Sequence, residues 1–202
     1  MEKLKIRIAD FFGTIILWLM MALDDIIDLA VTAVVTILVC FVLTNFFFMP
    51  VRVDGTSMYP TIENKSVGFS SIITRRVKEI ERFDIVIIRI NDQKENLVKR
   101  VVGLPGETIW YVNDTLYVNG TPVSEDFFDA VYVQQQKNKW NREDFTANTD
   151  VITLGEDEYY CLGDNRIVSI DSRSYGPFKA DQIMAKGIFV LWPFDHLGSP
   201  EN

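Results

Sequence analysis

The sequence predicts a mainly β protein: an antiparallel β-sheet domain with an inserted β subdomain, preceded by an N-terminal transmembrane helix. A 21-residue run without charge lies near the N-terminus. Roughly 150 residues follow it, enough for one substantial core, and in them short β-branched and aromatic runs alternate with turn signals. No strong amphipathic helical pattern appears after residue 50, so we expect the core to be built from strands.

Residues 29–49 form the predicted membrane helix, and Pro50 and Arg52 close the run. At ~1.5 Å of rise per residue, a helix of this length reaches about 30 Å, the thickness of a hydrocarbon core. A buried core helix fits poorly because the run is long and apolar on every face. A cleaved signal peptide also fits poorly, because no small-residue cleavage site follows.

A second apolar stretch, residues 11–23, precedes three aspartates and is open to two interpretations, the first half of a hairpin or a helix lying at the interface. Basic residues occur at the extreme N-terminus, at Lys3, Lys5 and Arg7. Because basic segments stay on the cytoplasmic side, we expect a single pass through the cell membrane. The expected order is a cytoplasmic or interfacial segment (1–28), the helix (29–49) and an extracytoplasmic domain (50–202).

The expected strands share β-branched or aromatic composition and short length, and they cover residues 85–90, 97–102, 110–112, 116–118 and 187–192. We place the inserted subdomain at about 108–158, and expect an irregular loop in its polar part, 123–150. A net charge of -8 argues against a nucleic-acid partner. Two cysteines and one histidine provide no cluster with metal-ligand spacing, so we expect no metal and no cofactor.

Ser57 lies in a glycine- and proline-bounded turn, residues 51–61, at the end of an expected strand. A serine needs a base to act as a nucleophile. The only histidine, His196, lies near the C-terminus and is expected to be solvated. The local pattern by itself favours an ordinary turn serine.

Lys99 shares one face of an expected strand with Leu97 and Val101. An apolar face desolvates an ammonium group and lowers its pKa, which a lysine general base requires. A solvated lysine on an edge strand explains the pattern equally well. Further along, residues 159–177 are dense in short polar side chains and arginine, which suits either a buried hydrogen-bond network or a surface loop.

Together these segments resemble the bacterial type I signal peptidases, in a Gram-positive-like form. The motifs occur in the family's order: Gly-Thr-Ser-Met-Tyr-Pro-Thr (55–61), Arg-Phe-Asp-Ile-Val (82–86), Lys-Arg-Val-Val-Gly-Leu-Pro-Gly-Glu (99–107) and Gly-Asp-Asn-Arg-x-x-Ser-x-Asp-Ser-Arg-x-x-Gly (163–176). The resemblance covers roughly residues 30–192, and four ordered motifs are far more specific than any one of them. It implies a membrane-bound serine endopeptidase that removes signal peptides from exported proteins.

The resemblance also implies roles for individual residues. Ser57 matches the nucleophile, Lys99 the general base, and Ser169 the serine that orients this lysine, while Asp171 and Arg173 match a structural pair beneath the site. The Ser57 N–H would donate to the oxyanion. Some relatives add a serine hydroxyl two residues before the nucleophile; here Gly55 occupies that position, which leaves the second donor unassigned.

Signal peptides of secretory preproteins and the lipid bilayer are the partners that this resemblance implies. An extended peptide would add a strand beside the Ser57 strand. Five side chains would form shallow apolar pockets suited to a small-x-small (Ala-x-Ala-like) cleavage site: Val51, Val53, Met58, Leu97 and Val98.

Two other classes of protein remain as alternatives. A self-cleaving Ser/Lys repressor shares the chemistry but needs a DNA-binding domain, whereas this chain has an anchor and a negative charge. A non-catalytic membrane-tethered scaffold for surface protein assembly would not need Ser57 and Lys99 together.

Overall fold

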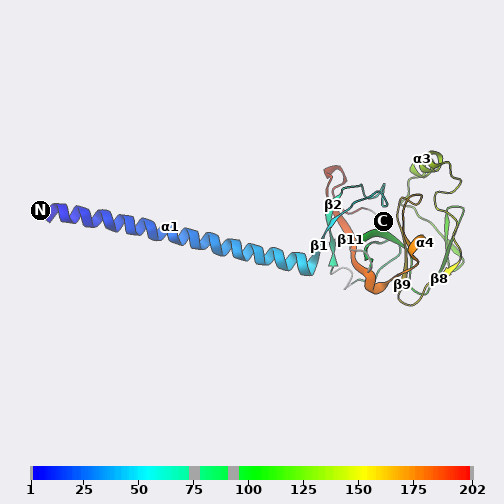
Figure 1. The fold of residues 1–202 in the computed structure, drawn as a ribbon, viewed down its shortest axis with the longest axis horizontal. Coiled ribbons are helices and arrows are strands. Elements are labelled where there is room, and N and C mark those ends of the chain that lie inside the picture. The colour runs from blue at the N-terminus through cyan, green and yellow to red at the C-terminus, as the bar shows by residue number, and fades with distance from the viewer. Residues whose placement is uncertain (1, 73–77, 91–95, 201–202) are drawn as a thin grey trace. The chain divides into compact units, whose positions relative to one another are not determined.

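The structure is a computed structural model that describes residues 2–72, 78–90 and 96–200. The chain divides into two units, Met1–Asn45 and Phe46–Asn202. The first unit is helical, and the second contains all the strands of the described residues (Figure 1).

Helix α1, Glu2–Val42, is continuous and ends in a π-helical turn, Leu43–Phe47. Its segment Leu17–Val42 is 26 residues long and apolar enough to cross a membrane. The Thr36 hydroxyl donates to the Thr32 carbonyl at 2.8 Å, so this polar group is satisfied within the helix. Residues 11–23 belong to the same helix, so they do not form one arm of a hairpin.

The end of the apolar run differs from the sequence expectation, because Phe48 and Met49 begin strand β1, Phe48–Arg52. They pair with Ser71 and Ser70 of β2, Val67–Ser71. A short apolar segment suits a strand as well as a helix, and the pairing with β2 decides between them here.

The larger sheet has seven strands in the order β1-β2-β11-β3-β4-β9-β10, and all neighbours are antiparallel. Its other members are β3 (Ile85–Arg89), β4 (Asn96–Gly103), β9 (Glu158–Leu162), β10 (Phe178–Lys179) and β11 (Ile183–Trp192). The predicted mainly β, antiparallel fold is confirmed.

A second sheet, in the order β7-β6-β5-β8, lies between β4 and β9 in the chain. It comprises β5 (Thr108–Val112), β6 (Thr115–Val118), β7 (Thr121–Val123) and β8 (Ile152–Thr153). Asn113 and Asp114 form the two-residue β5–β6 turn with positive φ of 48° and 64°, which asparagine and aspartate tolerate. Since β4 and β9 pair with each other, the chain leaves and re-enters the larger sheet at neighbouring strands.

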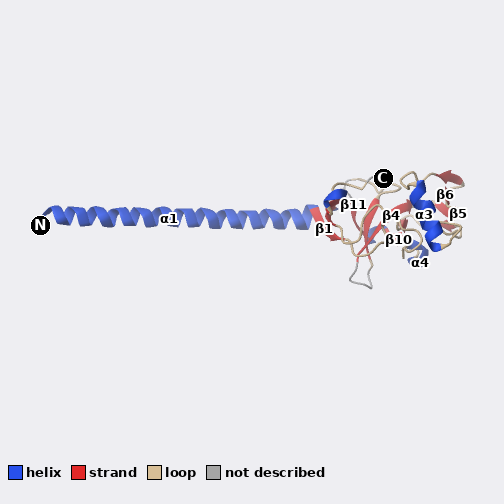
Figure 2. Cartoon of the chain, turned by 90° about the horizontal axis from the view of Figure 1, so that it is seen from above, coloured by secondary structure: helices blue, strands red, loops and turns tan. Residues whose placement is uncertain are grey.

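The polar segment expected to be an irregular loop contains helix α3, Ala130–Trp140 (Figure 2). Asp129 caps its N-terminus by accepting from the Tyr132 N–H, and Asn141 ends it in the left-handed conformation. None of its residues is fully buried. The helix therefore has no apolar stripe from which periodicity could predict it. A shorter helix, α4 (Ser172–Tyr175), and the 3-10 turns Ala180–Gln182 and Phe194–His196 complete the described elements.

Strand alternation divides the core of the larger sheet between its two faces. One cluster contains Val86, Ile88, Val101, Cys161, Phe178 and Ile183. A second contains Val53, Met58, Ile62, Ile85 and Ile188. In a third, Val102, Tyr160 and Leu162 of the larger sheet pack with residues of the second sheet. The segment after β1 thus contributes Val53, Met58 and Ile62 to the second cluster, where they pack with Ile85 of β3 and Ile188 of β11. This packing positions the turn that contains Ser57.

Candidate active site

Ser57 lies in a turn that backbone hydrogen bonds close on both sides of it. The Tyr59 N–H donates to the Thr56 carbonyl at 3.2 Å, and the Ile62 N–H donates to the Met58 carbonyl at 2.9 Å. Met58 and Ile62 are buried, whereas Ser57 is only half-buried. The buried neighbours therefore anchor the turn and leave the Ser57 side chain accessible.

A second loop, which follows β9, fixes this turn from the opposite side. Asn165 donates its N–H to the Ser57 carbonyl at 3.0 Å and its side-chain amide to the Thr56 carbonyl at 3.1 Å. Because β1 and β9 are far apart in the strand order, these contacts require the sheet to curl until the two loops meet.

A buried ion pair connects this second loop to β4. Arg100 donates to both oxygens of Asp164, at 2.9 and 2.8 Å, and both side chains are fully buried. The Thr61 hydroxyl also donates to Asp164, which ties in the far end of the Ser57 turn. Bidentate pairing with additional hydrogen bonds satisfies charges that would otherwise be costly to bury.

Lys99 precedes Arg100 on β4 and points to the opposite face, where it pairs with Val86 and lies beside Val101 and Cys161. Only 2% of Lys99 is exposed. Its Nζ lies 2.8 Å from Ser57 Oγ. Burial lowers the pKa of Lys99 from 10.5 to about 8, although the charges of Asp171 and Asp164 partly oppose this shift.

Asp171 and Arg173 form the pair expected near the site. Arg173 donates to both carboxylate oxygens at 2.8 Å, and the Gly163 N–H donates to Asp171 at 3.0 Å. Burial alone would raise the pKa of Asp171, but the hydrogen bonds and charge of Arg173 outweigh it and lower that pKa. Asp171 is therefore a carboxylate at neutral pH.

Ser169 lies against Gly163 together with the Ser57 carbonyl, because a β-carbon at Gly163 would overlap both groups. Its hydroxyl oxygen is buried and makes no hydrogen bond of good geometry within the described chain, although its proximity helps to lower the pKa of Asp171. Lys99 Nζ donates its hydrogen bond to Ser57 Oγ and makes none to Ser169.

The donors for an oxyanion are limited in this turn. In the described part of the chain the Ser57 N–H has no acceptor, which leaves it available. The Gly55 N–H donates to Asn64 Oδ1 at 2.9 Å and is already engaged. Gly55 has a φ of 123°, a conformation that favours glycine.

The apolar residues predicted to line substrate pockets divide between the two faces. Val51, Val53, Met58 and Val98 belong to one cluster. Leu97 packs instead against the cluster on the Lys99 face. Val53 and Met58 are buried, and Val51 and Val98 are half-buried.

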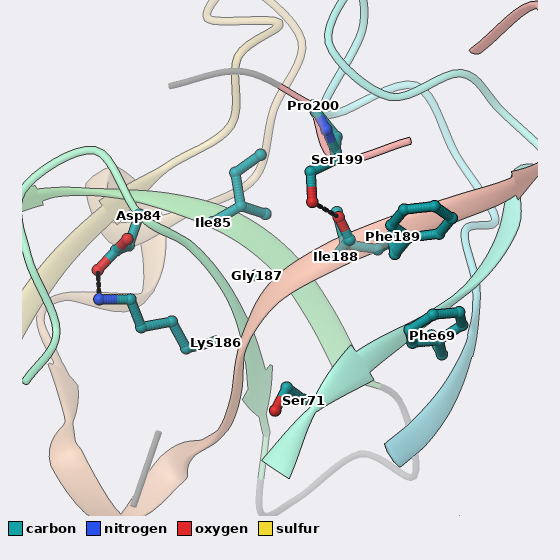
Figure 3. Close-up of a pocket in the computed structure, with 10 residues that line it drawn as sticks. All are labelled: Phe69, Ser71, Asp84, Ile85, Lys186, Gly187, Ile188, Phe189, Ser199 and Pro200. Carbon is teal, nitrogen blue, oxygen red and sulfur yellow. Dashed lines mark hydrogen bonds and ion pairs between the residues drawn. The ribbon is translucent and has the colours of Figure 1, made fainter. Parts of the chain in front are cut away.

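Another pocket, of about 430 Å³, opens between β2, β11 and the start of β3 (Figure 3). Phe69 and Phe189 stack at one end, and Lys186 pairs with Asp84 at 2.6 Å at the other. Lys186 also donates to the Glu79 carbonyl. Its amine is thus engaged by two acceptors, and neither Ser57 nor Lys99 lines this pocket.

Several residues that hold the site together lie in the motifs, but the sequence did not assign them roles. Asn165, Asp164, Arg100 and Thr61 connect the Ser57 turn, the second loop and β4. Their only signal was their position within the segments 55–61, 99–107 and 163–176. His196 lies elsewhere, 3.3 Å from the Glu63 carboxylate, with a side chain 41% exposed.

A serine hydroxyl within hydrogen-bond distance of a desolvated amine is the arrangement of a hydrolase that activates its nucleophile with lysine. Comparison with known proteins agrees with this class. The family model described as "Signal peptidase, peptidase S26" matches residues 26–192. The chain belongs to this family of bacterial signal peptidases, and the predicted resemblance is confirmed. Its activity is that of a serine endopeptidase that cleaves signal peptides.

Three similar proteins from Gram-positive bacteria illustrate the relationship. "Signal peptidase I S" of Bacillus subtilis (strain 168) is 35% identical over 177 residues, covering 86% of this chain and 92% of the relative. "Signal peptidase IB" of Staphylococcus aureus (strain COL) is 32% identical over 186 residues, covering 88% and 97%. A crystal structure of a signal peptidase I from Enterococcus faecalis V583 is 34% identical, with a TM-score of 0.47, and covers 55% of this chain and 97% of that one.

Proposed function

We propose that Ser57 is the nucleophile and Lys99 the general base with which this chain cleaves signal peptides from preproteins. The supporting observation is the 2.8 Å distance between Lys99 Nζ and Ser57 Oγ. The pKa of about 8 for Lys99 also supports it, because a base that operates near neutral pH must be partly unprotonated there.

In this mechanism neutral Lys99 accepts the Ser57 proton while Ser57 Oγ bonds to the scissile carbonyl carbon. The Ser57 N–H donates to the oxyanion that forms. As the carbon–nitrogen bond breaks, Lys99 returns the proton to the leaving amine and an acyl-enzyme remains. Lys99 then deprotonates a water molecule whose oxygen bonds to the ester carbon, and as the bond from that carbon to Ser57 Oγ breaks, Lys99 returns the proton to Oγ.

Asp171, Arg173 and Ser169 would act beneath this pair. The Asp171 charge raises the pKa of Lys99 against the effect of burial, and Arg173 keeps that carboxylate in one orientation. Ser169 packs on Gly163, beside the Ser57 carbonyl. We propose that it orients the Lys99 amine when substrate is bound.

The signal peptide would bind as an extended strand. Strand β1 stands at the end of the larger sheet and, among the described strands, pairs only with β2. An edge strand offers free backbone groups to a peptide. Half-buried Val51 and Val98, over buried Val53 and Met58, provide a shallow apolar floor that suits alanine-sized side chains at a small-x-small site.

The chain would be anchored by α1, with the N-terminus in the cytoplasm and the catalytic domain outside. The apolar segment Leu17–Val42 and the basic Lys3, Lys5 and Arg7 support this orientation. We also propose that the residues of the second sheet, within 108–158, form an inserted subdomain. Right-side-out membranes treated with protease test the orientation: survival of the C-terminal domain would contradict it.

The dyad is tested with Ser57→Ala and Lys99→Ala in the full chain, purified in detergent and incubated with a preprotein that carries an Ala-x-Ala site. Each variant should lose cleavage and keep its melting temperature to within a few degrees. Ser174→Ala and Lys179→Ala are matched controls, because both residues are exposed. Normal processing by Lys99→Ala would disprove the proposed base, and normal processing by Ser57→Ala would disprove the nucleophile.

A further inference from the structure

We propose that Tyr132 of helix α3 is a positioning residue for the nucleophile turn, so that the segment between strands β7 and β8 of the second sheet helps to place Ser57. This inference rests on the proposed role of Ser57. Tyr132 lies outside the four motifs that carry the family resemblance.

The contact is made at the backbone of the turn itself. Tyr132 Oη donates to the Tyr59 carbonyl at 3.1 Å, and the two rings pack at 5.8 Å between centroids. Tyr59 is two residues beyond Ser57, and its own N–H closes the turn onto Thr56. A group that holds Tyr59 therefore restrains the backbone that carries Ser57.

Two further contacts, with Asp129 and Phe145, fix Tyr132 itself. The Asp129 side chain accepts from the Tyr132 N–H at 2.8 Å, and the Tyr132 ring meets Phe145 edge-on at 5.9 Å. Phe145 is 3% exposed and belongs to the interior under α3. Because a cap and a buried ring fix Tyr132, its hydroxyl is a preorganised donor.

Two different parts of the chain therefore donate hydrogen bonds to the backbone carbonyls of the turn. Asn165 holds the carbonyls of Thr56 and Ser57. Among the described residues, Tyr132 is the only donor to the carbonyl of Tyr59. Burial raises the pKa of Tyr132 to about 12, so the hydroxyl keeps its proton wherever the peptidase works.

Loss of the hydroxyl should affect the chemical step and leave substrate binding unchanged. Within the described part of the chain, Tyr132 makes no hydrogen bond to Lys99, whose amine is hydrogen-bonded to Ser57, and it is not a member of the cluster that contains Val51 and Val98. A single half-exposed hydrogen bond contributes modestly, so Tyr132→Phe should reduce the single-turnover cleavage rate at saturating substrate by about fivefold. The half-saturating substrate concentration and the pH midpoint should stay as in the unchanged chain.

The experiment compares Tyr132→Phe with Tyr117→Phe in the full chain in detergent. Tyr117 is stacked on Trp110 in the second sheet, 5.3 Å between ring centroids, and is a matched control for loss of a tyrosine hydroxyl. Single-turnover cleavage, half-saturation, pH profile and melting temperature are measured for both variants. Tyr132→Leu, which also loses both ring contacts, should slow cleavage further.

A slower cleavage step with unchanged half-saturation, pH midpoint and melting temperature, in Tyr132→Phe only, would support the positioning role. An unchanged rate would overturn it, as would a slower rate that appears equally in Tyr117→Phe or follows a lower melting temperature. Ser57→Ala separates the two proposals. If that variant still cleaves, the proposed nucleophile is wrong; if it is inactive while Tyr132→Phe is normal, only the present inference fails.

Discussion

The pH dependence of cleavage follows directly from the burial of Lys99. Its pKa is lowered from 10.5 to about 8. At pH 7 a lysine of pKa 8 is about 9% neutral, whereas one of pKa 10.5 is about 0.03% neutral, so burial supplies ~300 times more active base. The rate should therefore rise about tenfold per pH unit below pH 7, reach half its maximum near pH 8, and level off above about pH 9.5.

The measurement is kcat/KM between pH 6 and 10, because this ratio reports the ionisation of the free enzyme. The substrate is a synthetic peptide with an Ala-x-Ala site and no group that titrates in this range. Melting temperatures across the same range show that the chain stays folded. A flat profile, or a midpoint near 10.5, would refute the idea that a desolvated Lys99 is the base.

Three further predictions concern stability. Because the folded pKa of Lys99 lies below its unfolded value, the unfolded state binds more protons between about pH 8 and 10.5, and the unfolding free energy should rise with pH by about 3 kcal/mol across this window. Lys99→Met should remove that rise, stabilise the chain at pH 7 and abolish cleavage. Urea unfolding at pH 7 and 10 measures the unfolding free energy, and a Lys99→Met variant whose unfolding free energy still rises by the same amount would contradict this prediction. Gly55→Ala should cost about 1–3 kcal/mol because φ is 123° there. Gly155→Ala should cost less, because its φ is not in that region and an added β-carbon would meet only the flexible Glu158 side chain, at 3.3 Å; equal melting temperatures of the two variants would contradict the prediction. Arg100→Met should cost about 3–5 kcal/mol by leaving the buried Asp164 charge unpaired, and the additional Asp164→Leu change should recover part of it; a single variant as stable as the unchanged chain in urea would refute the reasoning.

The strands were predictable because their composition matches their surroundings. Residues 85–88 of β3 are buried whichever face they point to, and a continuous run of β-branched residues is typical of such a strand. Helix α3 was not predictable, since it buries none of its residues completely and its formation depends on the caps Asp129 and Asn141. The predicted end of the helix, at residue 49, is wrong for a related reason. Phe48 and Met49 would suit a helix or a strand equally well by composition, and only pairing with β2 makes them part of a strand.

The candidate pockets illustrate a limit of sequence periodicity. Leu97 and Val98 are adjacent and both apolar, so a strand would point them to opposite faces, but the sequence does not tell which of these faces carries the other apolar candidates. In the sheet they point to opposite sides, and only Val98 joins the cluster of Val51, Val53 and Met58.

The sequence by itself determined that a long apolar segment precedes the domain, that the domain is mainly β and, through four ordered motifs, which serine and lysine to consider. From local pattern alone, neither residue could be distinguished from an ordinary surface residue. Tertiary structure decided that they are partners, because the two lie 42 positions apart and only a curled sheet brings them within 2.8 Å. It also decided the pKa of Lys99, since desolvation depends on neighbours such as Val86 and Cys161 that only the pairing of β4 with β3 and β9 brings to its face.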